Sequence, residues 1–154
     1  MIRKLAMHDP TMAEKVFSLQ REAYLREAAL IGTEEIPPLQ ESPEMLMNSG
    51  EQFFGYFSGE ELCGVVAFRK DGDCVDICRL FVKPERFRQG IGRKLLEFVG
   101  GIRGIRRAVV CTGAANLPAL RFYQKNGFHP VETLRKGPVL LTRLEKRWEP
   151  ERPH

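Results

Sequence analysis

The stretch that decides the fold reads VDICRLFVKPERFRQGIGRKLL and spans residues 75–96. Its first part continues the strand-like run 74–82, and from Gly90 onward apolar residues recur at helical spacing. Gly90 and Gly92 let an anion approach the main chain without a Cβ in the way. Backbone N–H groups at the start of a helix, together with the helix dipole, attract such anions. The stretch therefore predicts a strand, a loop and a helix, with an anion site where the helix begins.

The glycine loop alone does not identify a ligand. No Lys-Ser or Lys-Thr follows its glycines, as it would in a nucleotide-triphosphate loop, and the third glycine of a dinucleotide fingerprint is absent. Arg88 and Arg93 add cationic donors beside the loop. A tight strand-to-helix turn with solvated arginines around it is the alternative interpretation. If the loop does bind a ligand, we expect a diphosphate carrier other than NAD or ATP.

The remaining patterns predict a mixed α/β (α+β) fold. Strand-like runs occur at residues 2–6, 52–57, 62–69, 74–82, 108–112 and 139–144. Helical patterns occur at residues 10–29, 42–48, 90–100 and 117–125, and Asp9 and Ser42 mark the first two starts. Short turns that contain glycine join the runs between 52 and 82, so those strands pair antiparallel, and strand-helix-strand units follow. We therefore expect a central sheet of about six or seven strands with helices on both faces.

Length and composition indicate one domain spanning residues 1–154, since the chain shows no repeat, linker or low-complexity block. From about residue 149 the tail has little to bury, so we expect it to be flexible. No apolar run approaches the roughly 18 residues of a membrane span, and the N-terminus lacks the apolar core of a signal peptide. The cysteines lack C-x-x-C spacing and lie in strand-like surroundings typical of small buried hydrophobes; they are Cys63, Cys74, Cys78 and Cys111. We therefore expect a reducing cytoplasm and no metal.

The net charge of +4 is unevenly distributed along the chain. Residues 1–82 carry 8 basic and 14 acidic side chains, whereas residues 83–107 carry 8 basic and 2 acidic ones. The segment between Arg26 and Arg69 has no Lys or Arg at all. Its glutamates are Glu27, Glu34, Glu35, Glu41, Glu44, Glu51, Glu60 and Glu61. We expect whatever meets this first half to tolerate or prefer positive charge. A basic domain that binds nucleic acid is a weaker alternative, because exposed aromatics and a recognition-helix pattern are missing.

A second motif follows downstream: Asn116-x-x-Ala119-x-x-x-Tyr123-x-x-x-Gly127-Phe128. Asn116 stands just before the predicted helix, and Tyr123 comes two turns later on the same side. An amide can bond the peptide-like groups of a ligand, and a phenol can give a proton to a leaving group. The glycine loop followed by this motif resembles the GCN5-related N-acetyltransferase (GNAT) superfamily, and the resemblance is concentrated between about Phe53 and Phe128.

The resemblance implies a fold in which two neighbouring central parallel strands splay apart, with acetyl-CoA bound in the V-shaped gap between them. It implies that the backbone of Leu80, Phe81 and Val82 pairs with the pantetheine arm. The pyrophosphate would be held, mainly through main-chain N–H groups, by Arg88, Gln89, Gly90, Ile91, Gly92 and Arg93. Asn116 would bond the pantetheine, and Tyr123 would protonate the departing thiolate.

One position departs from the family pattern. The family usually has Gln or Arg three residues before the first glycine, whereas this chain has Phe87 there, between Arg86 and Arg88. Either Arg88 supplies the lost contact or the affinity for the cofactor is lower. We expect the main-chain cradle to survive, because it depends on the glycines and on the end of the helix.

Two residues are candidates for the proton transfers. Asp76 lies among apolar neighbours on a central strand, where a carboxylate can act as general base, directly or through water. The alternative is a structural carboxylate bonded to a neighbouring strand or to Arg79. Cys111 on the next strand would be a poor base. Tyr123 is the candidate acid, and an ordinary core aromatic is the alternative interpretation.

The predicted function is an N-acetyltransferase that moves an acetyl group from acetyl-CoA directly to a primary amine of a small-molecule or peptide acceptor. The glutamate segment falls where this fold commonly covers the acceptor, so we expect a cationic acceptor; glutamates that are merely solvated are the alternative. A CoA-binding domain of the same fold that has lost catalysis and serves in sensing is a second hypothesis. Family members are often dimers, so a homodimer is a further option, and neither nucleic acid nor membrane is expected as a partner.

Overall fold

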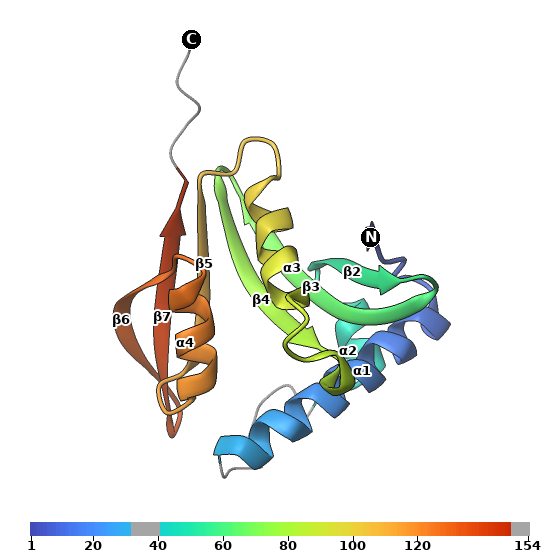
Figure 1. Ribbon diagram of the computed structural model, residues 1–154, viewed down its shortest axis with the longest axis horizontal. Coiled ribbons are helices and arrows are strands. Elements are labelled where there is room, and N and C mark those ends of the chain that lie inside the picture. Colours follow the sequence, from blue (N-terminus) through green and yellow to red (C-terminus); the bar gives the residue numbers. More distant parts are fainter. Residues whose placement is uncertain (32–40, 149–154) are drawn as a thin grey trace. The chain divides into compact units, whose positions relative to one another are not determined.

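The computed structural model describes residues 1–31 and 41–148 of the chain (Figure 1). Its strands are β1 (Ile2–Lys4), β2 (Gln52–Ser58), β3 (Glu61–Asp71), β4 (Cys74–Val82), β5 (Arg107–Gly113), β6 (His129–Lys136) and β7 (Val139–Arg147). Its helices are α1 (Pro10–Ile31), α2 (Pro43–Met47), the 3-10 helix η2 (Pro84–Arg86), α3 (Ile91–Gly100) and α4 (Leu117–Lys125). The strands follow the order β1-β2-β3-β4-β5-β7-β6 in a seven-stranded sheet. The predicted mixed α/β fold is confirmed.

The chain forms two compact units. Unit 1 comprises Met1–Phe68 and Arg79–Leu95, and unit 2 comprises Arg69–Cys78 and the described chain from Leu96 onward. The elements β3, β4 and α3 contribute residues to both units. That the two units form one domain over 1–154 stays a prediction, and the predicted flexible tail lies outside the described residues.

The first two helices of unit 1 begin where the sequence predicts. Thr11 N donates a hydrogen bond to Asp9 Oδ1 at 2.9 Å, and Ser42 Oγ accepts one from Met45 N at 3.3 Å. Both side chains therefore satisfy an amide that the first helical turn leaves without a carbonyl partner. The helix α1 runs to Ile31, slightly beyond its predicted end, because the strong helix former Ala29 extends it.

Helices cover both faces of β3 in unit 1. On one face, side chains of α1 and α2 pack with Val65 and Ala67 in a single buried cluster. Gly64 faces the other side, because successive strand residues point to opposite faces. A Cβ on Gly64 would lie 2.9 Å from Ile91 Cγ2 and 3.3 Å from Leu95 Cδ1. The first turns of α3 therefore lie directly on the backbone of β3, which only a glycine permits.

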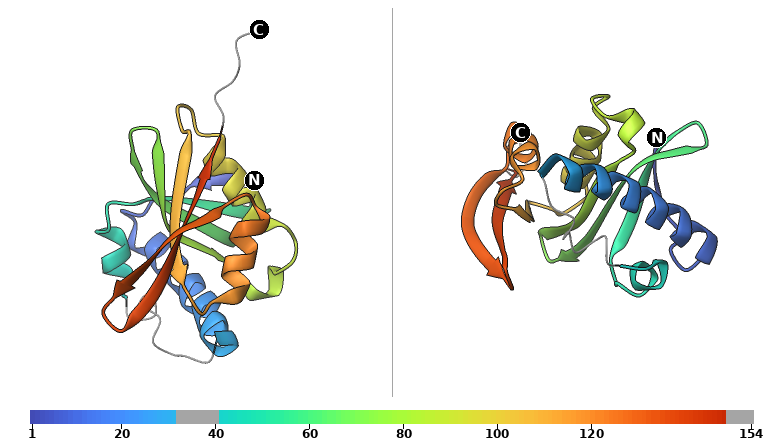
Figure 2. Two further views of the ribbon diagram at one scale, coloured as in Figure 1. Left: turned by 90° about the vertical axis from the view of Figure 1, so that its left-hand side faces the viewer. Right: turned by 90° about the horizontal axis from the view of Figure 1, so that it is seen from below.

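Unit 2 contains the predicted parallel pair of strands. The strand β4 pairs with β5 in parallel from Cys74↔Arg107 to Ile77↔Val110, and β5 pairs antiparallel with β7. The two views of Figure 2 show β6 and β7 side by side as one twisted ribbon. The pattern of the sequence misses β6, because all eight of its residues are exposed and none marks an apolar face. The splay of the central parallel strands beyond Ile77 stays a prediction.

The cysteines and the helices bear on the cellular setting. All four cysteines are free thiols; Cys63 is buried, Cys74 and Cys78 are half-buried, and Cys111 is exposed. The prediction of buried cysteines is right for Cys63 and wrong for Cys111, which follows the buried part of β5. Within the described ranges, no helix has the length and apolarity that crossing a membrane requires.

Candidate active site

The glycine loop of unit 1 has the geometry of an anion-binding turn. Gly90 has a φ of 76°, a left-handed conformation that glycine adopts without strain, and its carbonyl accepts a hydrogen bond from Lys94 N at 3.0 Å. The amides of Ile91, Gly92 and Arg93 thus come before the first carbonyl that can pair with them within α3. A Cβ on Gly90 would find its nearest neighbour, Arg93 Nη2, at 3.7 Å. The main chain is therefore approachable where the sequence predicts a pyrophosphate site.

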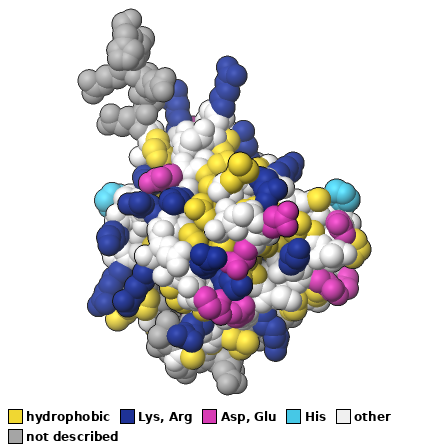
Figure 3. Space-filling view, turned by 45° about the vertical axis from the view of Figure 1, so that its right-hand side comes forward, with side chains coloured by type: hydrophobic (Ala, Val, Ile, Leu, Met, Phe, Trp, Pro, Cys, Tyr) yellow, Lys and Arg dark blue, Asp and Glu magenta, His cyan; other side chains and the backbone are white. Residues whose placement is uncertain are grey.

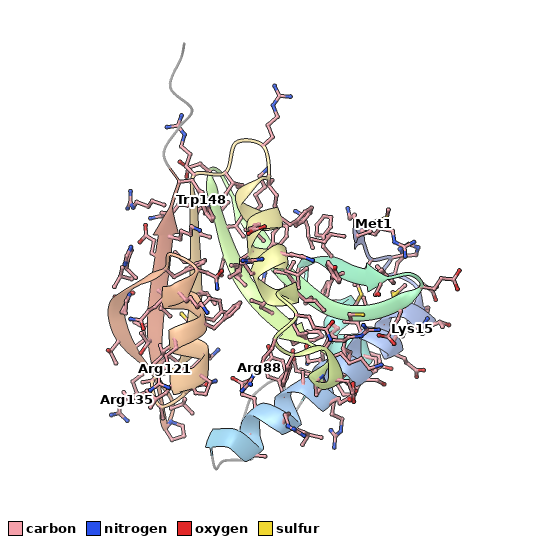
Figure 4. The ribbon with its side chains drawn as sticks, viewed as in Figure 1. Met1, Lys15, Arg88, Arg121, Arg135 and Trp148 are labelled. Carbon is pink, nitrogen blue, oxygen red and sulfur yellow. The ribbon has the colours of Figure 1, made fainter. Side chains whose placement is uncertain are left out.

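Arg88 gives this loop its sharp turn. Its φ of 66° makes it the one non-glycine residue with a positive φ in the described part of the chain. Both Arg88 and the adjacent Gln89 are exposed, and Figure 4 labels Arg88 on the loop between β4 and α3. Left-handed residues other than glycine are costly, and they concentrate at sites that bind ligands. Backbone and side chain at this position are therefore both accessible to an anion.

Arg86, on the other side of Phe87, has a different task. The Glu61 carboxylate accepts hydrogen bonds from Arg86 Nε at 3.0 Å and lies 2.8 Å from Arg86 Nη2. The Cys63 thiol and the Arg86 guanidinium hold the pKa of Glu61 below its ordinary value. The exposed ring of Phe87 offers no donor, and Arg86 is tied to the start of β3. Of the two arginines beside Phe87, Arg88 is the one placed to replace the family's usual side-chain contact.

The end of β4 is anchored on one side only by β3. Lys83 N donates a hydrogen bond to the Cys63 carbonyl at 2.7 Å, so this amide points toward β3. Because strand amides alternate in direction, those of Leu80 and Val82 point away from β3. Phe81 is buried in the core of unit 1, and its two neighbours are half-buried. The predicted pantetheine strand thus keeps one backbone edge that β3 does not use.

A buried charge cluster lies directly before this strand end, and the sequence analysis did not find it. Arg79 binds Glu51 with two hydrogen bonds, at 2.7 and 3.1 Å, and Glu41 with two more. Arg79 Nη1 also donates to Gln20 Oε1 at 2.9 Å. Burial alone would lower the pKa of Arg79, but the hydrogen bonds from both carboxylates raise it above its ordinary value. The guanidinium therefore stays charged, and it ties β4 to α1 and to the residues that follow the undescribed segment 32–40.

These contacts correct the prediction for the glutamate segment. Glu41 and Glu51 neutralise Arg79, and Glu61 pairs with Arg86. The three carboxylates therefore serve the fold of unit 1, whereas Glu34 and Glu35 lie outside the described residues. Figure 3 shows a face on which acidic side chains lie among basic ones. The alternative that Arg79 holds Asp76 is wrong, because its guanidinium binds the two glutamates and Gln20.

Asp76 lies on the part of β4 that belongs to unit 2, in register with Val109 of β5. Its neighbours Val75 and Ile77 are buried but Asp76 is exposed, so the expectation that apolar neighbours would bury it is wrong. Alternate strand residues point to opposite faces, and the carboxylate takes the open one. Cys78 shares that face and is half-buried, as predicted. An exposed carboxylate can exchange protons with water, and its role as base stays a prediction.

The second motif lies entirely within unit 2. Asn116 caps α4, since its Oδ1 accepts a hydrogen bond from Ala119 N at 3.2 Å, and its side chain is buried. Tyr123 is also buried, with its ring 5.2 Å from that of Phe122 and 5.5 Å from that of Phe128. The edge-to-face contacts make Tyr123 part of the core at the end of α4. Its predicted role as acid, and that of Asn116 toward pantetheine, are left untested by these contacts.

No group of His, Cys, Asp and Glu suited to a metal ion occurs among residues 1–31 and 41–148. The functional groups that unit 1 brings together are instead main-chain amides and arginines at the start of α3. Unit 2 contributes a capping amide, a buried phenol and the exposed carboxylate of Asp76.

Comparison with known proteins gives relatives of two kinds. The UPF0157 protein YqkA of Bacillus subtilis (strain 168) is 37% identical over 142 residues, which cover 92% of this chain and 41% of that protein. The chain thus spans about two fifths of the length of YqkA. The Spermidine N(1)-acetyltransferase of Thermoplasma acidophilum is 29% identical over 123 residues, covering 78% of this chain and 71% of the relative.

Solved structures and a family model agree with these relatives. The PaiA N-acetyltransferase of Thermoplasma acidophilum in complex with coenzyme A superposes with a TM-score of 0.80 at 27% identity, covering 96% of this chain and 98% of the other. The family described as "Acetyltransferase (GNAT) domain" matches residues 49–130, more than half of the chain. The match includes the glycine loop and the segment from Asn116 to Phe128. The chain belongs to the GNAT acetyltransferase family.

Proposed function

We propose that the chain is an N-acetyltransferase that moves an acetyl group from acetyl-CoA to a primary amine by direct attack in a ternary complex. The observation that carries the proposal is the loop before α3, where left-handed Arg88 and Gly90 present the first helical amides beside exposed arginines. Oriented amides and guanidinium groups suit the pyrophosphate of CoA. Further support comes from the coenzyme A bound in the related PaiA structure.

The proposal gives each predicted site residue one task. The backbone of Leu80, Phe81 and Val82 pairs with the pantetheine arm, along the edge of β4 that β3 does not use. The pyrophosphate is held by Arg88, Gln89, Gly90, Ile91, Gly92 and Arg93. Asn116 bonds the pantetheine, and Tyr123 gives a proton to the departing CoA thiolate.

The chemistry needs a neutral amine, a stabilised oxyanion and a proton for the thiolate. Asp76 takes the proton that the amine loses as it attacks, directly or through a water molecule. Its exposure supports a route through water, because an exposed carboxylate is already hydrated. Tyr123 supplies the proton at the other end of the reaction, and the phenol is held in place by the rings of Phe122 and Phe128.

The acceptor we propose is a cationic amine such as a polyamine, an aminoglycoside-like amine or a basic peptide amine. One relative is named as a spermidine acetyltransferase, which supports this class. In the glutamate segment, Glu44 and Glu60 are exposed, whereas Glu41, Glu51 and Glu61 are engaged with arginines. We further propose a cytoplasmic location, supported by the free thiols, and a homodimer, which size-exclusion chromatography with light scattering would test.

The test is release of CoA thiol from acetyl-CoA in the presence of amines, with spermidine, an aminoglycoside and a lysine peptide set against a neutral amide. We expect turnover with the cationic amines. Tyr123→Phe should lower kcat by about 100-fold, the scale of a lost general acid. The melting temperature should stay near that of the wild type, because the ring contacts remain.

Three other outcomes are informative. An unchanged kcat in Tyr123→Phe would remove Tyr123 from the mechanism. Thermal stabilisation by acetyl-CoA without turnover of any amine would favour a sensing domain. Retention on nucleic acid with a steep salt dependence, and no stabilisation by acetyl-CoA, would contradict the proposed function.

A further inference from the structure

A tyrosine outside both sequence motifs reaches the predicted pantetheine strand. Tyr24 lies on α1 and packs against the buried core of unit 1, with its ring 5.8 Å from that of Phe81 at an interplanar angle of 59°. Its hydroxyl oxygen accepts a hydrogen bond from the backbone N–H of Leu80. Ring and hydroxyl thus contact two consecutive residues of β4.

The hydroxyl lies on the functionally relevant edge of that strand. The amide of Lys83 is turned toward β3, where it binds the Cys63 carbonyl, so the amide of Leu80, three residues earlier, is turned away from β3. Tyr24 therefore meets β4 along the edge that the proposed function assigns to the pantetheine arm. A group bound there in extended form places its thioester beside this phenol.

The surroundings keep the phenol neutral. Burial, reinforced by the negative charge of Glu27, raises the pKa of Tyr24 above its ordinary value. The other charged groups that act on it are Arg79, which opposes the shift, and Glu41, which adds to it. A phenol that stays protonated keeps an O–H to donate. The N–H of Leu80 polarises that O–H, because a hydrogen bond accepted at an oxygen strengthens the one it donates.

We propose that Tyr24 is a catalytic residue whose O–H donates a hydrogen bond to the thioester carbonyl oxygen of acetyl-CoA. The inference rests on the proposed function. As the amine nitrogen bonds to the carbonyl carbon, the C=O π electrons move to the oxygen, and the phenol stabilises that charge. When the C=O bond reforms, the C–S bond breaks and its electron pair leaves with the CoA thiolate. The thiolate takes its proton from Tyr123, so Tyr24 keeps its own proton throughout.

The first test is the kinetics of Tyr24→Phe, which removes the hydroxyl and retains the ring contact with Phe81. Loss of one oxyanion donor typically lowers kcat by roughly 100- to 1,000-fold, and we expect that effect with a much smaller change in the KM for acetyl-CoA. The matched control is Tyr56→Phe, which removes a phenol of β2 that lies 3.4 Å from Lys94 Nζ. Its kcat with spermidine should equal that of the wild type.

The second test needs no acceptor. The infrared stretch of the thioester carbonyl, isolated with ¹³C-labelled acetyl-CoA, moves to lower frequency when the oxygen accepts a stronger hydrogen bond. The bound carbonyl should therefore absorb at higher frequency in Tyr24→Phe than in the wild type, and Tyr56→Phe should match the wild type.

The outcomes separate this inference from the proposed function. An active wild type combined with unchanged kcat and carbonyl frequency in Tyr24→Phe would overturn the role of Tyr24 alone. A lower KM for acetyl-CoA at unchanged kcat would overturn it as well, since the phenol would then merely compete for the Leu80 amide. A wild type that turns over no amine would remove the proposed function, and with it this assignment.

Discussion

The substitution Gly64→Ala tests whether the close contact of β3 with α3 holds the start of that helix. The added Cβ would lie 2.9 Å from Ile91 Cγ2, 3.3 Å from Leu95 Cδ1 and 3.3 Å from the Phe81 carbonyl oxygen. Carbon atoms in favourable contact are about 3.5 to 4.0 Å apart, so Ile91 would have to move by at least roughly half an ångström. Ile91 is the first residue of α3 and is buried, so this movement displaces the helix start itself.

The expected cost follows from two opposing effects. Inserting a methyl group into a packed core costs about 1 to 3 kcal/mol, whereas replacing glycine by alanine restricts the unfolded chain and returns about 0.4 to 1 kcal/mol. A net loss of about 1 to 2 kcal/mol in the free energy of unfolding corresponds to a fall of roughly 2 to 8 °C in Tm for a chain of this size. Because the moved residue follows Gly90 directly, the affinity for acetyl-CoA should also fall.

The assay is thermal unfolding followed by circular dichroism, together with calorimetric titration of acetyl-CoA. Gly113→Ala is the matched control, because a Cβ there meets Asn116 Cβ at 3.8 Å, an ordinary contact, so its Tm should be unchanged or slightly higher. The reasoning is refuted if Gly64→Ala unfolds at the temperature of the wild type and binds acetyl-CoA equally well. A lower Tm with unchanged affinity would refute only the link between the contact and the glycine loop.

Two further predictions concern the ion pairs of unit 1. Glu61→Gln should weaken acetyl-CoA binding, because the turn before the glycine loop loses its ion pair, whereas the exposed neighbour in Glu60→Gln should have no effect in the same titration. Since the folded pKa of Glu61 is lowered, its contribution is present above the ordinary value of 4.5 and is lost as the pH falls through the lower folded value, which titrations at several pH values would detect. Glu51→Ala leaves the buried Arg79 undercompensated and should cost about 3 to 5 kcal/mol by urea unfolding; a loss below about 1 kcal/mol would contradict a buried, bidentate pair.

Local chemistry made much of the fold predictable. Asp9 and Ser42 each supply a side-chain oxygen at a helix start, and β4 and α4 have the bounds that the sequence predicts. These features depend on residues a few positions apart, so a single window of sequence contains the cause and the effect. The strand β6 could not be found in this way, because it is an exposed edge strand held by backbone pairing with β7.

The missed parts of the candidate site depend on contacts between distant residues. Arg79 meets partners that are 28, 38 and 59 residues away along the chain, and none of them stands in a recognisable pattern. The hydroxyl of Tyr24 reaches Leu80 across a similar sequence distance. A glutamate in sequence looks the same whether it faces solvent or an arginine. Asp76 illustrates the converse, because buried neighbours do not reveal which face of a strand a carboxylate takes.

The charge distribution of the chain acquires a more specific meaning from these contacts. In the described part of the glutamate segment, Glu41 and Glu51 compensate an arginine that directly precedes the predicted pantetheine strand, and Glu61 compensates one that directly precedes Phe87. The acidic half therefore fixes the two backbone segments from which a CoA site would be built, and it does so with charges that are no longer available to attract an amine. The net charge of residues 1–82 consequently overstates the acidity that an acceptor would meet. Any preference for a cationic acceptor has to come from the carboxylates that the fold of unit 1 does not use.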